Sequence, residues 1–246
     1  MMVFAQISDI HLDGGQRRLD RAQAVASYLD GLSMPLAAVL VTGDIADHGL
    51  PAEYEQARDL FATSPHPVFP CPGNHDRRHA YRETLLGTAG SDAPVNQVHR
   101  TENALFALCD STIPGRDDGR LADETVAWLD DALARHPDLP AFVCCHHPPV
   151  ELHSPFSDGI RLTDEQRLAD VLAHHPQVVA LLCGHAHTPA ATTFAGRPVR
   201  VSPGVASTQV LPWEQGDGST DAVPPGVAFH VLDDQRRLTT HYRVVV

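Results

Sequence analysis

The sequence has 246 residues and a formal charge of −13, from 18 Lys and Arg against 31 Asp and Glu. Because contacts to a phosphate backbone need clustered cations, this acidic balance disfavours DNA or RNA polymers as partners. A hydrophobic content of 43% is typical of a globular protein, and the length suits one domain over residues 1–246.

Short apolar runs alternate with helical patterns over the first three quarters of the chain. Strands are predicted at 3–8, 37–42, 67–70, 104–109, 141–145 and 178–183, and helices at 17–29, 51–62, 77–86, 122–135 and 164–174. This alternation predicts an α/β protein with much of its sheet parallel.

After His187 the helical patterns stop. Strands are predicted at 190–194, 199–201, 205–210, 227–232 and 238–246, and 212–225 reads as a long surface loop. Because no helices separate these late strands, we expect them to pair antiparallel in a second sheet packed on the first.

The sequence carries no signal-peptide pattern near its start, and no run approaches the ~18 apolar residues of a membrane span. We therefore expect a cytoplasmic protein with no membrane partner. The five cysteines are expected to be buried and reduced. Cys144 and Cys145 adjoin His146, but neighbouring strand residues point to opposite faces, which disfavours a metal or redox pair.

Five short polar motifs each follow a predicted strand. They are Asp9-Ile10-His11, Gly43-Asp44, Gly73-Asn74-His75-Asp76, His146-His147-Pro148-Pro149 and Gly184-His185-Ala186-His187. Ligands of open α/β sheets bind at the carboxyl ends of the strands. We therefore expect the motifs to meet at one rim.

The motifs supply enough donor atoms for two metal ions side by side. Asp9 and His11 are two residues apart, as are His185 and His187, so in extended backbone each pair leaves one face of its strand. Asp44 offers two carboxylate oxygens and can bridge two ions.

Two further donors complete the set. Asn74 offers an amide oxygen from a sharp turn that Gly73 permits, and His146 offers another imidazole. Mixed imidazole and carboxylate ligation suits Mn, Fe, Zn or Co better than Mg or Ca. Two such ions about 3.5–4 Å apart polarise a phosphoryl oxygen and generate hydroxide at neutral pH, and their positive charge suits an anionic phosphoester.

Taken together and in this order, the five motifs resemble the calcineurin-like metallophosphoesterase superfamily. The segment 43–49 followed by Glu53-Tyr54, and Pro224-Pro225-Gly226 before a late strand, resemble the class III cyclic-nucleotide phosphodiesterase and glycerophosphodiesterase branch. The likeness spans roughly residues 3–245.

The resemblance implies a four-layer αββα sandwich, with two mixed β-sheets flanked by helices. It implies two divalent or trivalent transition-metal ions (Mn, Fe or Zn). One would be held by Asp9, His11, Asp44 and His187, and the other by Asp44, Asn74, His146 and His185. His75 would be the catalytic residue that faces the phosphate, as a hydrogen-bond or proton donor, and Asp76 would orient His75 or cap the helix that starts at Arg77.

Three positions bear on the details. Purple acid phosphatases have a tyrosine where this chain has Asp47, which disfavours that subgroup. Asp47 itself could either support the ligands from outside or be a turn residue. Some phosphodiesterases have an arginine where this chain has Thr188. We place His147 beside the ligands, hydrogen-bonded to one of them, rather than on a metal.

The sequence thus predicts a metal-dependent hydrolase of small phosphodiesters, such as 3′,5′-cyclic nucleotides or glycerol-type diesters, in a chain that could form a homodimer. A phosphomonoesterase or a promiscuous phosphoesterase is the alternative within the same class. A non-catalytic scaffold that binds partner proteins should have lost ligands or the residue at position 75, and a nuclease should have a basic channel. This sequence shows neither feature.

Overall fold

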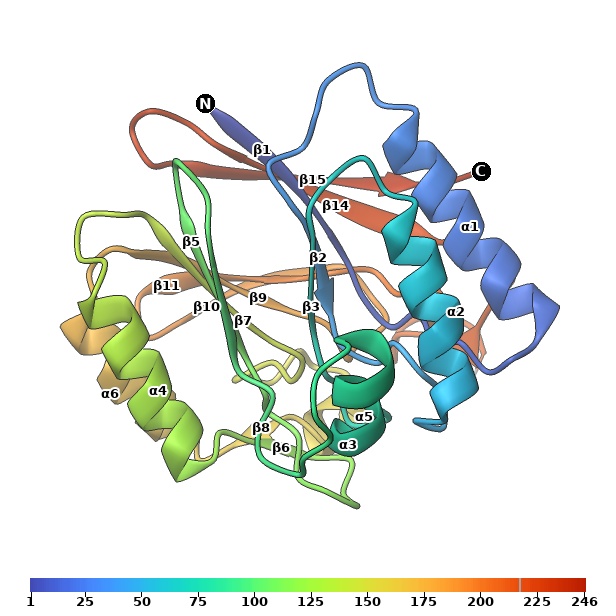
Figure 1. Cartoon of the computed structure of the whole chain (residues 1–246), viewed down its shortest axis with the longest axis horizontal. Helices are drawn as coiled ribbons and strands as arrows, with labels where there is room; N and C mark the ends of the chain where they lie inside the picture. Colours follow the sequence, from blue (N-terminus) through green and yellow to red (C-terminus); the bar gives the residue numbers. More distant parts are fainter. Residues whose placement is uncertain (217) are drawn as a thin grey trace.

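Two β-sheets lie face to face in the computed structural model, which describes residues 1–216 and 218–246 (Figure 1). The first sheet has the strand order β15 (Leu238–Val244), β14 (Gly226–Leu232), β1 (Met2–Ile7), β2 (Val39–Thr42) and β3 (Val68–Cys71). The second has the order β10 (Ala190–Phe194), β11 (Arg197–Val201), β9 (Val178–Cys183), β7 (Ala141–Cys145), β5 (Leu105–Cys109) and β4 (Gln97–Arg100). Two small ribbons pair β12 (Thr208–Gln209) with β13 (Ser219–Thr220), and β6 (Gly119–Arg120) with β8 (Leu162–Thr163).

Helices cover the outer face of each sheet. The apolar faces of α1 (Gln16–Asp30) and α2 (Pro51–Ala62) pack on the first sheet. Those of α4 (Asp123–Ala134) and α6 (Glu165–His174) pack on the second. Two short elements, α3 (Arg78–Ala80) and α5 (Pro155–Gly159), lie near the carboxyl ends of the strands (Figure 1). The predicted four-layer αββα sandwich is confirmed.

Aromatic side chains join the two sheets. The ring of Phe4 on β1 lies 5.1 Å from that of Phe106 on β5 and 4.9 Å from that of Phe142 on β7. All three side chains are fully buried. The residues that alternate with them in the same strands face the helices and are also apolar. Because both faces of these strands are buried, polar residues are mostly found where the strands end.

All six early strands form within two residues of their predicted ends. The helix predicted at 77–86 is only partly α-helical, because α3 runs on into a π-helical turn over Tyr81–Leu85. Sequence patterning missed β4 and α5, which carry no clear apolar periodicity.

The predicted antiparallel pairing of the late strands is confirmed for β10 with β11 and for β14 with β15, but the prediction that they form a sheet of their own is wrong. β14 and β15 pair antiparallel but extend the first sheet from β1, whereas β11 pairs parallel with β9 in the second sheet. The reason is that pairing among the earlier strands leaves one edge of β1 and one edge of β9 without a neighbour. The backbone N–H and C=O groups on such an edge are unpaired, and a later strand forms hydrogen bonds with them.

Two loop predictions also need correction. Of the strand predicted at 205–210, only β12 forms, because the N–H groups of Val205 and Ala206 donate instead to the carbonyls of Ser8 and Asp9. The loop predicted at 212–225 contains β13, and residue 217 of that loop lies outside the described residues.

The five cysteines are free and buried, as predicted. Cys145 faces the helices together with Cys183, and Cys144 faces the layer between the sheets, so the adjacent pair points in opposite directions. Within the described part of the chain, every helix is too short or too polar to cross a bilayer.

Candidate metal centre

The seven predicted ligands meet where the two sheets share one rim. Asp9 and His11 follow β1, Asp44 follows β2, and Asn74 follows β3. The second sheet contributes its residues from the ends of β7 and β9, namely His146, His185 and His187. All seven are at least partly buried, so the fold brings together residues that are far apart in the chain.

One group of donor atoms lies around Asp9. Nε2 of His11 is 3.1 Å from Nε2 of His187. The same atom of His11 is 3.5 Å from Oδ2 of Asp44, and Nε2 of His187 is 3.5 Å from Oδ1 of Asp9. Four side chains therefore direct donor atoms at one small volume.

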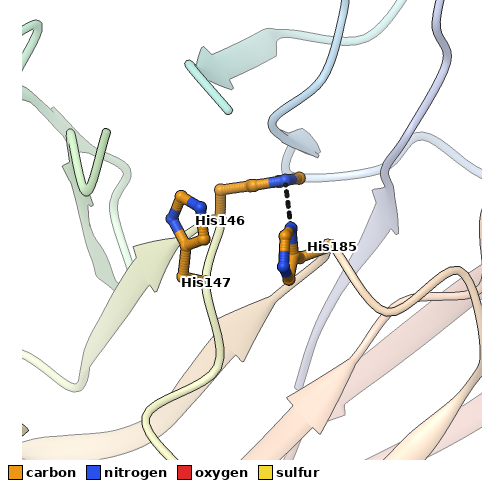
Figure 2. A group of neighbouring side chains, drawn as sticks. All are labelled: His146, His147 and His185. Carbon is orange, nitrogen blue, oxygen red and sulfur yellow. Dashed lines mark hydrogen bonds between the residues drawn. The ribbon is translucent and has the colours of Figure 1, made fainter. Parts of the chain in front are cut away.

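A second group shares Asp44 with the first. Nε2 of His146 lies 3.3 Å from Oδ2 of Asp44. Nδ1 of His185 lies 3.2 Å from that nitrogen of His146 (Figure 2). The same atom of His185 lies 3.1 Å from Oδ1 of Asn74. Asp44 thus borders both groups, as a bridging carboxylate must.

The backbone at the ligands is not extended. Asp9, His11, Asp44, His185 and His187 all have positive φ, between 48° and 70°, a region that non-glycine residues rarely adopt. The prediction that extended backbone places each Asp or His pair on one face is therefore wrong. Left-handed residues turn the chain sharply after β1, β2 and β9, and such strain persists where surrounding contacts hold it.

Two glycines leave room for this crowding. Gly43 has a φ of 97°, and a Cβ there would overlap the imidazole of His146. A Cβ on Gly73 would overlap the carboxylate of Asp44. The predicted turn is present, since the N–H of Asp76 donates to the carbonyl of Gly73 at 3.0 Å, but Gly73 does not have positive φ, so close approach to Asp44 explains the glycine.

Asp76 has a different role from either predicted one. It accepts hydrogen bonds from the N–H groups of Ile45, Ala46 and Gly73 at 2.9–3.2 Å and from the hydroxyl of Tyr54 at 3.0 Å. It therefore ties the loop after β2 to the loop after β3, and its carboxylate neither accepts a hydrogen bond from the His75 ring nor caps α3, which begins at Arg78. Burial and the charge of Asp44 raise the pKa of Asp76 to about 6.

Asp47 supports two histidines, so it is more than a turn residue. Its carboxylate accepts a hydrogen bond from Nδ1 of His11 at 2.8 Å. Its backbone carbonyl accepts one from Nδ1 of His75, also at 2.8 Å. His75 is 41% exposed and its Nε2 is not committed to a partner within the described chain, which leaves that edge of the ring available to a substrate.

His147 lies beside His146 and His185 (Figure 2), with one of its nitrogens within 4.8 Å of a nitrogen of each, but both of its nitrogens are bonded to other groups. Nδ1 is hydrogen-bonded to Ser111 Oγ at 2.7 Å, and Nε2 donates to the carbonyl of Asp117 at 3.1 Å. The predicted hydrogen bond to a ligand is therefore absent, although ring contact is present. Burial and the charge of His146 lower the pKa of His147 to about 3, which keeps the ring neutral.

Sequence reasoning missed the partners that orient two of the histidines. Nδ1 of His146 donates to the carbonyl of Thr42 at 2.7 Å, and Nδ1 of His187 is hydrogen-bonded to Ser207 Oγ at 2.9 Å. No motif signals a backbone carbonyl or a serine twenty residues downstream, so these contacts were not predictable from the sequence.

The charges at the centre favour a cation. Burial opposes ionisation of Asp44, but His146, His11 and His75 together outweigh it and hold the pKa of Asp44 well below its usual range. Burial likewise lowers the pKa of His146. The carboxylate of Asp44 acts most strongly in the opposite direction, and the pKa of His146 is raised to about 9. The proton that His146 holds beside the carboxylate of Asp44 therefore occupies a position that a metal ion can take.

The donor set fits metal binding. His11, His146 and His187 each anchor Nδ1 on an oxygen and present Nε2 inward, the arrangement that outer partners impose on metal-binding histidines. Nε2 of His185 is buried with no hydrogen-bond partner among the described residues, which is costly unless another group satisfies the ring. Four overlapping groups of Asp and His at the rim could each hold an ion, namely His146-His147-His185, Asp9-His11-His187, His11-Asp44-His75 and Asp9-Asp44-His146.

Known proteins resemble this chain in both sequence and fold. Residues 2–189 match the family model of the calcineurin-like phosphoesterases. A probable cyclic nucleotide phosphodiesterase of Rhodococcus erythropolis is 33% identical over 239 residues, covering 93% of this chain and 79% of the relative. The glycerophosphodiester phosphodiesterase GpdQ of Enterobacter lignolyticus is 32% identical over 243 residues, covering 93% of this chain and 86% of the relative.

A solved structure supports the same fold. A dimetal phosphatase from Danio rerio superposes with a TM-score of 0.74 at 15% identity, covering 100% of this chain and 96% of that one. The resemblance inferred from the five motifs is therefore confirmed, including the branch that contains both kinds of phosphodiesterase.

Proposed function

This chain belongs to the calcineurin-like phosphoesterase family and is a phosphoric diester hydrolase, and we propose that it cleaves small phosphodiesters such as 3′,5′-cyclic nucleotides with two transition-metal ions at the rim. The observation that carries the proposal is the convergence of two donor groups on a shared Asp44. We further propose that residues 1–246 form one domain, because both sheets share the aromatic layer around Phe4.

The distances support the ligand assignment as predicted. The first ion would be held by Asp9, His11, Asp44 and His187, and the second by Asp44, Asn74, His146 and His185. Mixed nitrogen and oxygen donors favour Mn, Fe or Zn over Mg or Ca. When bound, such ions supply Lewis acidity and activate water as a nucleophile.

Residues around the ligands give the site its order. Asp76 fixes the two loops that carry Asp44 and Asn74. Outer partners hold the ligand imidazoles by hydrogen bonds, as Asp47 does for His11. These contacts reduce the reorganisation that the reaction requires, because the donors are already aimed where charge develops.

We propose that His75 meets the phosphate. Its Nδ1 donates to the carbonyl of Asp47, so Nε2 carries a proton only when the ring is an imidazolium. In that form it can donate to the oxygen of the departing alcohol. As a neutral ring it can only accept a hydrogen bond there.

A non-catalytic scaffold is disfavoured, because the chain keeps all seven ligands and an exposed edge of His75. A phosphomonoesterase uses the same donor set, so substrate assays must separate the two activities. Nothing in the geometry of the rim favours monoesters over diesters.

The test combines elemental analysis with turnover of four phosphate esters. Protein purified without chelator and loaded with Mn or Zn should contain about two ions per chain. It should hydrolyse bis(4-nitrophenyl) phosphate and a 3′,5′-cyclic nucleotide faster than 4-nitrophenyl phosphate, with a glycerophosphodiester as the fourth substrate. One ion or none after loading, or hydrolysis of the monoester alone, would overturn the proposal.

A further inference from the structure

A cavity of about 180 Å³ opens beside the proposed ligand Asn74. One wall is the segment that runs from Asn74 into α3, and the other includes the loop 112–115. A phosphodiester whose phosphorus lies at the rim therefore has this cavity next to one of its organic groups.

The far wall of the cavity is held rigidly. Arg78 donates from Nε to Asp110 at 2.8 Å, from Nη1 to the carbonyl of Asp92 at 3.0 Å and from Nη2 to the carbonyl of Thr112 at 2.8 Å. Asp110 also accepts hydrogen bonds from the N–H and hydroxyl groups of Thr112, at 2.8 and 2.6 Å. A ligand entering here meets a preformed wall, which lowers the entropic cost of binding.

Arg77 differs from its neighbour because its guanidinium is free. It is exposed and lines the cavity, and no hydrogen bond or ion pair engages its side chain within residues 1–216 and 218–246. Its placement is nonetheless fixed, since its N–H donates to the hydroxyl of Tyr54 at 2.8 Å and its stem packs on Gly49.

The other lining groups restrict what the cavity can bind. Asp92 also lines it and forms no ion pair with Arg77 among the described residues, and Ile113 and Pro114 supply apolar surface. A purely anionic group would be repelled by the charge of Asp92. A purely apolar group would leave the charges of Arg77 and Asp92 without a partner. A nucleobase matches all three features, because it has apolar faces and an edge that carries both acceptors and donors.

Size points the same way. Pockets for whole drug-sized ligands span roughly 300–1,000 Å³, so a cavity of about 180 Å³ suits a base with the sugar and phosphate left at the rim.

We propose that this cavity binds the base of a nucleoside phosphodiester, and that Arg77 is the residue that selects it by paired hydrogen bonds to acceptors on the edge of the base. The inference rests on the proposed function, because it names the substrate class of the same site. A planar guanidinium fork can make two parallel hydrogen bonds to a base edge, which an ammonium cannot.

Binding experiments test the contact directly. Guanosine and adenosine 5′-monophosphates and ribose 5-phosphate are titrated calorimetrically into the metal-loaded wild type and into Arg77→Gln, Arg77→Lys and Arg100→Gln. Ribose 5-phosphate lacks the base, so the difference between ligands isolates it. Arg100 is a matched control, an exposed arginine on β4 whose register partner Leu105 is at the opposite end of β5 from the cavity.

We expect Arg77→Gln to weaken at least one nucleoside monophosphate about tenfold or more and to weaken ribose 5-phosphate far less. Arg77→Lys should not restore affinity, and Arg100→Gln should change neither ligand. An equal loss for ribose 5-phosphate, rescue by lysine, or no loss for either nucleotide would overturn the proposal.

Kinetics separate this inference from the proposed function. Arg77→Gln should lower kcat/KM for a cyclic nucleotide more than for bis(4-nitrophenyl) phosphate or a glycerophosphodiester. If the wild type hydrolyses diesters but the variant loses the same factor on every substrate, the base cavity is wrong and the function stands. If the loss falls mainly on the glycerophosphodiester, the cavity binds a polyol instead of a base. If the wild type hydrolyses no diester, both proposals fail.

Discussion

The layer between the sheets and the rim at its end are built from opposite kinds of residue, although the same strands supply both. In the layer, Phe4, Phe106 and Phe142 pack with ordinary strand backbone. At the rim, Asp44 and its neighbours are buried polar groups, and five of the predicted ligands have left-handed backbone. Burial of polar groups and positive φ are both unfavourable on their own, so we infer that the apolar layer fixes the strand ends firmly enough to hold them there.

This comparison predicts that the two regions fail in different ways. A change at the rim should remove metal or turnover and leave the fold intact. A change in the layer should lower the free energy of unfolding and leave the chemistry of the folded fraction intact.

Removing the shared carboxylate should have the largest effect. Asp44→Ala should lower turnover about 10⁴-fold or more and remove at least one ion per chain, because one side chain serves both donor groups. Asn74→Ala should weaken one ion only and recover partly in excess metal. Elemental analysis and turnover at increasing metal concentration measure both effects, and Asp59→Ala on the exposed face of α2 is the control. An identical and unrescuable loss in both rim variants would rule out the bridging role.

His75→Ala tests the part of the rim that is not proposed to hold metal. It should lower the rate about 10²–10⁴-fold, the range for positioned acid catalysis, with metal content unchanged. The loss should be small for nitrophenolate leaving groups and large for the alkoxide of a cyclic nucleotide, because only the alkoxide needs a proton. Loss of metal would make His75 a ligand, and equal losses on both esters would leave it a hydrogen-bond donor without an acid role.

Phe142→Ala tests the layer. Deleting this buried ring should lower the free energy of unfolding by about 3–5 kcal/mol, measured by urea denaturation followed by circular dichroism. The folded fraction should still bind the wild-type number of ions per chain. Phe156→Ala, where the ring is 63% exposed, should change stability by less than about 0.5 kcal/mol. If Phe142→Ala loses metal while folded, the rim and the layer are not separable.

A pH dependence of metal affinity is also expected, and for each pH unit it is the smallest of these effects. The pKa of His146 is raised to about 9 by Asp44 despite burial, so a proton competes with the ion below that pH, and affinity should fall as pH falls. One displaced proton corresponds to about tenfold per pH unit, measurable between pH 6 and 9 by competition with a chelator. Constant affinity over this range would mean that no proton occupies the centre in the metal-free protein.

Much of the fold was readable from the sequence, because hydrophobic periodicity is a local property. The six early strands and α2 appear where apolar runs and Pro51 place them. The positions of β14 and β11 were not readable, because their patterns only indicate strands. Which open edge a strand joins depends on the sheets that earlier strands have already formed.

The sequence by itself determined the chemistry of the site, namely which donors exist and that each follows a strand. Only the tertiary structure decided how they are held: the left-handed backbone at the ligands, Asp76 as the tie between two loops, and the nitrogens of His147 turned towards Ser111 and Asp117. The physical reason is that donor identity belongs to a residue alone. A φ angle, a ring orientation or a hydrogen bond at a crowded rim depends on neighbours that the chain brings from far away in sequence.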